Sequence, residues 1–374
     1  MSFIRRYRVV IVIALGLVLF RVAARPAQEL PSRLTDEEFW KLTSDFSEPD
    51  GNFHSDNFVS NERSFQHVLS DLSRGRQPGS AYIGVGPEQN FTYLLAVKPR
   101  LAFIVDIRRQ NLIEHLMFKA IFELSLDRAE FISRLFSRPR PPNAGRNSTV
   151  AELFDAFRSS GPDMNLYQDN LQAIRNKLMK EHGFALNTAD QSSLEYVFRA
   201  FFRLGPNLTY DGVQVGLTGA MPSFEQLMRE TDQDGASRSF MATEDNFQSL
   251  KDMHRRNALV PVVGDFAGPK ALRSVGQYLK DHNATVTAFY TSNVEQYLFM
   301  SEESWRKFYG NVSTLPVDGR SVFIRGLIRS EAGDLSSSPA LPLSSHYETG
   351  LFSITDLVAS FKAGKILTYY DVVR

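Results

Sequence analysis

A strand, a glycine turn and a helix follow one another between residues 81 and 97, and this succession constrains the fold more than any other feature. Ala81–Ile83 is a short apolar run that leads directly into Gly84-Val85-Gly86, so the pattern predicts a strand that ends in a tight turn. Residues 92–97 have the composition of a helix. This helix is expected to stop before Pro99, because proline disfavours helical backbone at the residue that precedes it.

A second apolar run and an acid complete the unit. Leu101–Val105 is apolar throughout, as is typical of a parallel strand that is buried on both faces. Asp106 follows this run, 22 residues after Gly84. Glycines in such a turn let the backbone approach a ligand, and an acid at this distance accepts hydrogen bonds from ribose hydroxyls. The unit predicts a nucleotide-type binding site; the alternative is a doubly wound domain whose tight turn binds nothing.

Short strings in and around this unit resemble known proteins. Tyr82–Pro87 (YIGVGP) and Phe103–Asp106 (FIVD) resemble motif I and the acidic motif of class I S-adenosylmethionine-dependent methyltransferases. The longer strings Gly84–Tyr93 and Val105–Asn111, together with Ser55–Glu62 upstream, resemble an uncharacterised bacterial methyltransferase-like family.

The resemblance implies a Rossmann-like fold and S-adenosylmethionine as the cofactor. By their place in the motifs, Gly84, Gly86 and Asp106 would contact this cofactor. Glu88 departs from the pattern, because the third glycine of a glycine-rich turn is expected at its position. In the methyltransferase pattern this position lies near the amino acid part of the ligand. An acid there would therefore either bind the ligand's ammonium group or block the site.

The end of a later predicted strand carries a further resemblance to the methyltransferases. Ala258–Val263 is an apolar run that is followed by Gly264, Asp265 and Phe266. This succession resembles the methyltransferase motif whose acid, or the backbone after it, contacts the adenine. Asp265 and Phe266 are therefore candidate cofactor contacts.

The next predicted strand, Thr285–Tyr290, leads into a polar segment. Many methyltransferases place the residues that bind the acceptor at this point. The resemblance therefore makes Asn293 and Glu295 candidate substrate contacts.

The segment Phe53–Glu62 mixes polar and aromatic residues without a helical or strand period. Binding residues are disproportionately found on loops, so we interpret this segment as a loop over a site, with Asn57 and Glu62 as candidate substrate contacts. The alternative is a loop that only leads into the next helix, which Ser60 or Asn61 would cap.

The whole pattern predicts an α/β fold, with a Rossmann-like, mainly parallel and doubly wound sheet. Ser321–Leu327 supplies a further strand, and Ile366–Val373 is expected to form an edge strand after a Ser/Pro-rich loop over 330–346. The second and third predicted strands are separated by about 150 residues with a mostly helical pattern. A parallel crossover needs only one helix, so we expect a large helical insertion after the second strand, over about 137–256.

Residues 1–31 are expected to be a targeting segment and linker, outside a single methyltransferase-like domain over 32–374. Three arginines precede twelve apolar or glycine residues, Val9–Phe20. This run is short for a spanning helix, which needs about 20 residues. It is therefore either a cleaved signal peptide or an uncleaved anchor that contacts the membrane. Both place the protein in the bacterial cell envelope, membrane-anchored or periplasmic, with residues 1–31 packed against nothing.

Composition excludes several classes of function. Basic and acidic residues are balanced at 42 each, so no excess of positive charge favours nucleic acid. Cysteine is absent, which excludes disulfides, thiolate metal sites and cysteine nucleophiles. The seven histidines are scattered without metal-ligand spacing, so no metal site is predicted. The sequence also lacks a Gly-x-Ser-x-Gly elbow and a Walker loop.

Two functions from different classes fit these patterns. The first is an enzyme that transfers a methyl group from S-adenosylmethionine to an unknown acceptor, a small molecule or another kind of partner. This reaction needs little beyond in-line positioning of the nucleophile. The second is a non-catalytic envelope protein that keeps the fold as a binding module. The targeting segment favours the second function, because S-adenosylmethionine is a cytoplasmic metabolite. An anchor that leaves the domain inside the cell would be compatible with the first, and a topology reporter fused after Arg374 separates the two arrangements.

Overall fold

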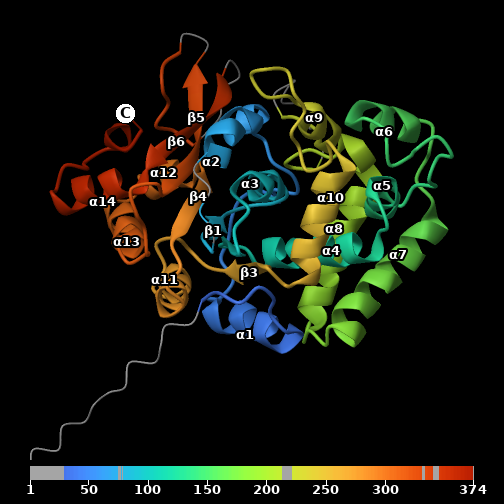
Figure 1. The fold of residues 1–374 in the computed structure, drawn as a ribbon, viewed down its shortest axis with the longest axis horizontal. Helices are drawn as coiled ribbons and strands as arrows, with labels where there is room; N and C mark the ends of the chain where they lie inside the picture. Colours follow the sequence, from blue (N-terminus) through green and yellow to red (C-terminus); the bar gives the residue numbers. More distant parts are fainter. Residues whose placement is uncertain are drawn as a thin grey trace, which may run out of the picture.

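The fold is built on one six-stranded sheet with helices on both of its faces (Figure 1). The computed structural model describes residues 29–74, 77, 79–212, 221–330, 333–339 and 345–373. The strands are β1 (Ala81–Gly84), β2 (Leu101–Asp106), β3 (Leu259–Val263), β4 (Val286–Ser292), β5 (Val322–Ser330) and β6 (Ser345–Ser353).

The other regular elements are helices. The α-helices are α1 (Asp36–Phe46), α2 (Leu69–Arg74), α3 (Gln89–Val97), α4 (Arg109–Leu124), α5 (Arg128–Phe136), α6 (Val150–Phe157), α7 (Met164–Asn176), α8 (Thr188–Leu204), α9 (Phe224–Arg229), α10 (Glu244–Arg255), α11 (Ala271–Asp281), α12 (Val294–Leu298), α13 (Glu302–Val312) and α14 (Ile354–Lys362). Short helical turns of other types are η1 (Arg63–Val68), η2 (Lys177–Glu181), η3 (Gly205–Asn207) and η4 (Tyr369–Asp371).

The sheet has the strand order β3-β2-β1-β4-β5-β6. Its first five strands pair in parallel, and β6 pairs antiparallel with β5. The α/β class and the mainly parallel sheet are therefore confirmed, and each of the five strands expected at residues 81–83, 101–105, 259–263, 285–290 and 321–327 is present. Because these five strands run the same way, their carboxyl ends meet at one edge of the sheet.

One face of the sheet is covered by α1, α11 and α13. Register places Ile83 of β1 between Phe103 of β2 and Phe289 of β4, so these three side chains share a face. Phe103 contacts the rings of Phe46 in α1 and Tyr278 in α11. α13 packs against Phe289 on the same face.

The opposite face is covered by α3 and α4. Tyr82 of β1 and Tyr290 of β4 point to this side, where they contact Asn90 and Tyr93 of α3. Aromatic rings of α3 and α4 pack against each other above the sheet. β1, β2 and β3 are consequently buried along their whole length, which explains why their sequences are apolar throughout.

The chain between β2 and β3 forms helices α4 to α10. α10 packs against α3 and α4, and the chain continues from it into β3. α5 and α7 pack against α8, which itself lies on α4, and α6 packs against α9. Figure 1 shows this group of helices on the side of the molecule away from β5 and β6.

One expectation about the C-terminal third was wrong. Ile366–Val373 is not an edge strand, because it contains the turn η4 and its Val372 carbonyl accepts a hydrogen bond from Arg325 Nη1 at 2.9 Å. The edge strand is β6, which begins at the end of the expected Ser/Pro-rich loop. In the mostly helical chain after β2, α4 ends at Leu124 and Asp127 caps the next helix, α5.

The targeting segment falls mostly outside the described residues, which begin at Glu29. Within the expected linker, Leu30 is buried in the core with 2% of its surface exposed, so this part of the linker packs against the domain. Arg33 Nη2 also donates to the Arg255 carbonyl at 2.9 Å. In the described part of the chain, no helix combines the length and apolar character that a membrane span requires.

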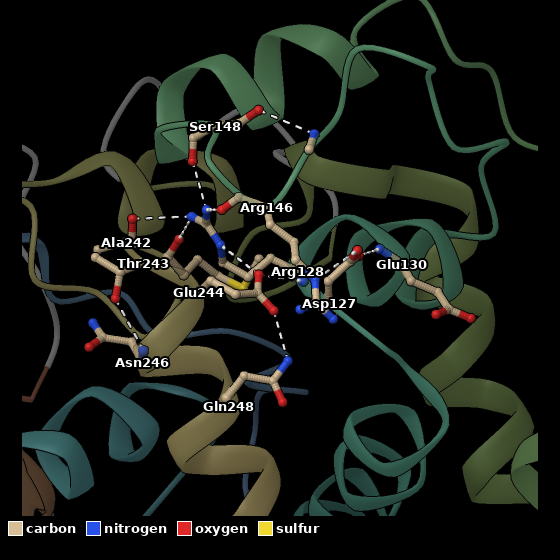
Figure 2. Close-up of polar contacts among 12 residues, drawn as sticks. Asp127, Arg128, Glu130, Arg146, Ser148, Ala242, Thr243, Glu244, Asn246 and Gln248 are labelled. Atoms are coloured by element: carbon tan, nitrogen blue, oxygen red, sulfur yellow. Dashed lines mark hydrogen bonds and ion pairs between the residues drawn. The ribbon is translucent and has the colours of Figure 1, made fainter.

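Arg128 joins three segments of the helical group in one buried network (Figure 2). Its side chain is fully enclosed, with only 1% of its surface exposed. Nη1 donates to the carbonyls of Met241 and Ala242 at 2.8 and 3.1 Å, and Nη2 donates to those of Arg146 and Ser148 at 2.8 and 2.7 Å. The guanidinium therefore satisfies four backbone carbonyls and holds the start of α5 against the start of α10.

Replacing this guanidinium should destabilise the protein strongly. We expect Arg128→Leu to lower the free energy of unfolding by about 3–5 kcal/mol, because it leaves buried polar partners without a donor. The matched control is Arg146→Leu, whose side chain in the same cluster is 62% exposed and should contribute less than about 1 kcal/mol. Urea denaturation of both variants measures the difference. Equal losses would contradict the role assigned to Arg128.

Candidate ligand-binding site

A pocket of about 320 Å³ lies at the carboxyl edge of the parallel strands. This volume is at the lower end of the range of about 300–1,000 Å³ that is usual for small-molecule sites. Residues from the ends of β1, β2, β3 and β4 contribute to it, together with the loop before η1. Its lining is Asn52, Phe53, Asn57, Ser60, Asn61, Val85, Gly86, Pro87, Val105, Asp106, Ile107, Arg108, Tyr210, Gly264, Asp265, Phe266, Tyr290, Ser292, Asn293, Val294, Tyr297 and Leu298.

The pocket brings together most of the residues predicted to bind a ligand. Gly86, Asp106, Asp265, Phe266, Asn57 and Asn293 all line it. Gly84, Glu88, Glu62 and Glu295 do not line it, and the last three are buried with at most 1% of their surface exposed. Each of these four has a different structural reason for its position.

Gly84 makes room for a side chain of the protein. A Cβ atom at position 84 would lie 1.9 Å from Asn90 Oδ1, so no larger residue fits there without displacing Asn90. Asn90 Nδ2 in turn donates to the carbonyls of Val85, Gly86 and Pro87 at 2.9, 3.2 and 2.8 Å. Asn90 of α3 thus holds the glycine turn in place through three hydrogen bonds, and the sequence motifs did not single out this residue.

Gly86 is the glycine that faces the pocket. Its φ of +72° lies in the left-handed region, which glycine adopts at little cost. His115 of α4 lies behind it, with Nε2 2.9 Å from the Gly86 carbonyl oxygen. Because a carbonyl only accepts, His115 must carry its proton on Nε2. Burial lowers the pKa of His115 to about 4, so the ring is neutral at neutral pH and donates this bond.

Asp106 lies at the end of β2 and is paired with Arg108. Arg108 Nε is 3.1 Å from Asp106 Oδ1 and Nη2 is 3.2 Å from Oδ2, and the Arg108 backbone N–H donates to Oδ1 at 2.9 Å. Arg108 Nη1 also donates to the carbonyls of Ser55 and Asp56. Arg108 therefore fastens the loop before η1 to the strand end that carries Asp106.

Glu88 lies behind the glycine turn, outside the pocket lining. Both of its carboxyl oxygens lie 3.2 Å from the backbone N–H of Ser60, which donates to them. The two arginines that follow β2 form ion pairs with other acids, Arg108 with Asp106 and Arg109 with Asp190. Burial raises the pKa of Glu88 to about 7. Glu88 thus holds, through Ser60, the loop Phe53–Glu62 that lies over the pocket, called the covering loop below.

Ser60 does not cap the helix that follows the loop. Its hydroxyl accepts from the Glu62 backbone N–H at 3.2 Å and donates to Gln89 Oε1. The turn η1 begins after Glu62 with no side-chain cap. The interpretation of Ser60 or Asn61 as a helix cap was therefore wrong, and the segment lies over the pocket instead.

Glu62 is buried behind the pocket wall formed by Tyr290 and Ser292. Its Oε1 accepts from Tyr290 Oη at 2.9 Å and from Ser292 Oγ at 2.6 Å, and its Oε2 accepts from Gln89 Nε2 at 3.1 Å. Gly326 of β5 leaves space for this carboxyl, because a Cβ atom there would lie 2.6 Å from Oε1. Burial raises the pKa of Glu62, while these hydrogen-bond donors lower it; the net direction is upward.

Glu295 belongs to a separate buried ion pair. Arg325 Nη2 donates to Glu295 Oε1 at 2.9 Å, and Tyr309 Oη donates to the same oxygen at 2.6 Å. Both side chains of the pair have 2% of their surface exposed. Glu295 therefore joins α12 to β5 and α13, and its near neighbour Asn293 is the one that faces the pocket.

Asp265 and Phe266, which were predicted to contact the adenine, follow the end of β3 and line the pocket. Asp265 Oδ1 accepts from the Ala267 backbone N–H at 2.9 Å, which closes a local turn. Phe266 stacks on Phe308 with ring centroids 5.5 Å apart, and Asn311 Nδ2 donates to its carbonyl at 2.8 Å. This corner of the pocket is thus rigidly supported by α13.

A family model matches residues 57–358 and is described as a domain of unknown function, DUF7790. The chain belongs to the DUF7790 family. The matched region contains all six strands and most of the pocket, whereas Asn52 and Phe53 of the lining precede it. No curated protein matches the chain.

Aromatic side chains make up a part of this DUF7790 pocket that the motifs did not indicate. Phe53 of the covering loop contacts Tyr297 of α12 edge to face, with centroids 5.3 Å apart. Tyr210 and Tyr290 line the same pocket. The only signal for these contacts in the sequence was the aromatic content of the loop. Among the described residues, no group of His, Asp and Glu is arranged to hold a metal ion.

The raised pKa of Glu88 gives the stability of the protein a defined pH dependence. Folded Glu88 keeps its proton up to about pH 7, whereas the ordinary value of 4.5 applies to the unfolded chain. The folded state therefore binds more protons in this window, and stability falls as the pH rises from about 4.5 to about 7.

Glu88→Gln should remove this contribution. We expect the variant to gain up to about 3 kcal/mol relative to the wild type between pH 5 and 8, from the shift in pKa. Denaturant titration over this range measures the difference. Glu37→Gln, on the exposed side of α1, is the control and should leave the pH profile unchanged. A constant offset between Glu88→Gln and the wild type at every pH would refute the assignment.

Proposed function

We propose that this pocket binds S-adenosylmethionine and that the protein transfers its methyl group to a small-molecule acceptor. The observation that carries the proposal is the convergence of Gly86, Asp106 and Asp265 on one pocket from the ends of β1, β2 and β3. These are the three strand ends at which the resemblance to class I methyltransferases expects the cofactor. Ligands of open parallel sheets bind outside such ends.

The strand order supports a Rossmann-like assignment for the sheet. The order 3-2-1-4-5-6 is the one found in doubly wound dinucleotide-binding folds, apart from the reversed direction of β6. α4 packs directly against β2 and β3, and α10 packs against α4 and leads into β3, whereas α5, α7 and α8 pack against α4 or against each other. We therefore interpret the region of about 137–256 as mainly an insertion into the crossover between β2 and β3.

The first turn of α3 favours this cofactor over a dinucleotide. A pyrophosphate normally binds the free N–H groups at a helix N-terminus. Pro87 has no N–H, and the Glu88 carboxyl lies at the start of α3. A phosphate placed there would lack the N–H that any other residue at position 87 would supply, whereas S-adenosylmethionine carries no phosphate.

We assign Asp106 to the ribose hydroxyls, because Oδ2 keeps a lone pair beside its bond from Arg108 Nη2, whereas Oδ1 already accepts two bonds from Arg108. Asp265 and Phe266 would border the adenine at the adjacent strand end. Asn57 and Asn293, on the loop and after β4, would face the acceptor. Glu88 would act on the site only through Ser60.

A non-catalytic binding module is the second candidate. The observation that favours it is the Arg108 guanidinium, which already bonds both oxygens of Asp106. In this reading, the N-terminal segment carries the protein to the bacterial envelope and the pocket binds a different small molecule.

Calorimetric titration of the full chain with S-adenosylmethionine and S-adenosylhomocysteine tests the proposal. Asp106→Asn keeps the shape of the side chain but loses its charge, and hydrogen bonds to charged groups contribute about 1.5–3 kcal/mol each. We therefore expect affinity to fall at least tenfold, with an unchanged circular dichroism spectrum. Asp45→Asn on the surface of α1 should bind as the wild type does. Absence of heat with the wild type at millimolar ligand would favour the non-catalytic candidate.

A further inference from the structure

Two hydroxyl groups on one wall of the pocket have their protons committed to the same buried carboxyl. Tyr290 Oη and Ser292 Oγ lie 2.9 and 2.6 Å from Glu62 Oε1, and both residues line the pocket. A hydroxyl group has a single proton to donate and two lone pairs with which it accepts. Hydroxyls that donate to Glu62 therefore offer only acceptor positions to a ligand.

The surroundings of Glu62 fix this direction of donation. Gln89 Nε2 donates to Glu62 Oε2 at 3.1 Å, and the orientation of this amide is set because Ser60 donates to its oxygen and Tyr93 Oη accepts from its nitrogen at 2.7 Å. The partners of the carboxyl are thus hydrogen-bond donors. A carboxylate surrounded by donors holds their protons, so the hydroxyls remain turned toward Glu62.

The backbone at Ser292 is shaped to present this wall. Ser292 has φ of +51°, a left-handed conformation that a non-glycine residue adopts only when its surroundings enforce it. It ends β4, and α12 begins two residues later at Val294. The hydrogen bond to Glu62 and the turn into α12 together place the Ser292 hydroxyl at the pocket surface.

We propose that the acceptor substrate is an amine, whose N–H groups donate to Ser292 and Tyr290; this inference rests on the proposed methyltransferase function. A donor group is required because the wall only accepts. An ammonium is favoured over a neutral hydroxyl because Glu62 places a negative charge directly behind the wall. The rings of Phe53 and Tyr297, which also line the pocket, add the attraction of aromatic faces for cations.

Ser292 and Glu62 can also remove the proton that the ammonium must lose before its nitrogen reacts. The bound ammonium passes one proton to Ser292 Oγ while the Ser292 proton passes to the Glu62 carboxylate, which leaves a neutral amine. The nitrogen lone pair then forms a bond to the methyl carbon, and the carbon–sulfur bond breaks with its electron pair going to sulfur. The products are a methylated ammonium and a thioether. Burial, which raises the pKa of Glu62, suits this carboxyl to accept the proton.

Three probes with the same ring and different head groups test the wall: phenethylamine, 2-phenylethanol and phenylacetate. Calorimetry with the full chain, in the presence and absence of S-adenosylhomocysteine, should give at least tenfold tighter binding of the amine than of the acid. Ser292→Gly removes the hydroxyl and suits the positive φ, which offsets part of the cost of the lost hydrogen bond to Glu62, so the variant should still fold. We expect it to weaken amine binding at least tenfold and to leave the S-adenosylhomocysteine affinity within twofold.

Tyr290→Phe is the second variant and should also weaken the amine selectively, whereas Ser249→Ala on the exposed side of α10 is the control. Phenylacetate binding as tightly as the amine would overturn the inference. So would absence of amine binding, or full amine affinity in Ser292→Gly. Amine binding without any S-adenosylhomocysteine binding would instead refute the methyltransferase proposal while the assignment of the wall stands.

Discussion

Parallel pairing of neighbouring strands is the constraint on which the rest of this molecule depends. It brings Asp106, Gly264 and Ser292, which are far apart in the sequence, to one edge of the sheet. A parallel sheet must be covered on both faces, and the chain meets this demand with α1, α11 and α13 on one side and α3 and α4 on the other. The carboxyl edge remains for a ligand, so the place of the pocket is a consequence of topology.

Three buried carboxyl groups support the pocket, and their partners differ in charge. Glu295 is paired with the guanidinium of Arg325, so its charge is balanced inside the protein. Glu62 has hydroxyl and amide donors, and Glu88 has the backbone N–H of Ser60. Burial raises the pKa of both of these acids. The charge of Glu295 is therefore balanced by a guanidinium, whereas Glu62 and Glu88 have no cationic partner among the described residues and their pKa values are raised.

The sequence patterns predicted β1 to β5 because buried parallel strands are apolar throughout, and their polar ends at Asp106 and Asp265 followed from the same runs. β6 was missed because an edge strand is buried on one side only, and Thr349 is among its buried positions. The motifs also assigned Gly84 to a ligand, although its hydrogen faces Asn90. A local sequence pattern shows how residues are spaced along the chain. The burial of Glu62 depends instead on β4 and β5, which contact it only in the folded protein.

The bond between Arg108 and Asp106 couples the covering loop energetically to ligand binding in the pocket. Arg108 holds the carbonyls of Ser55 and Asp56 while it neutralises Asp106. Any ligand group that draws Asp106 away from Arg108 weakens the hold on this loop, and linkage makes the effect reciprocal. Loosening the loop must then change ligand affinity by the same factor. Hydrogen exchange at the loop amides is thereby a reporter of occupancy that needs no knowledge of the ligand.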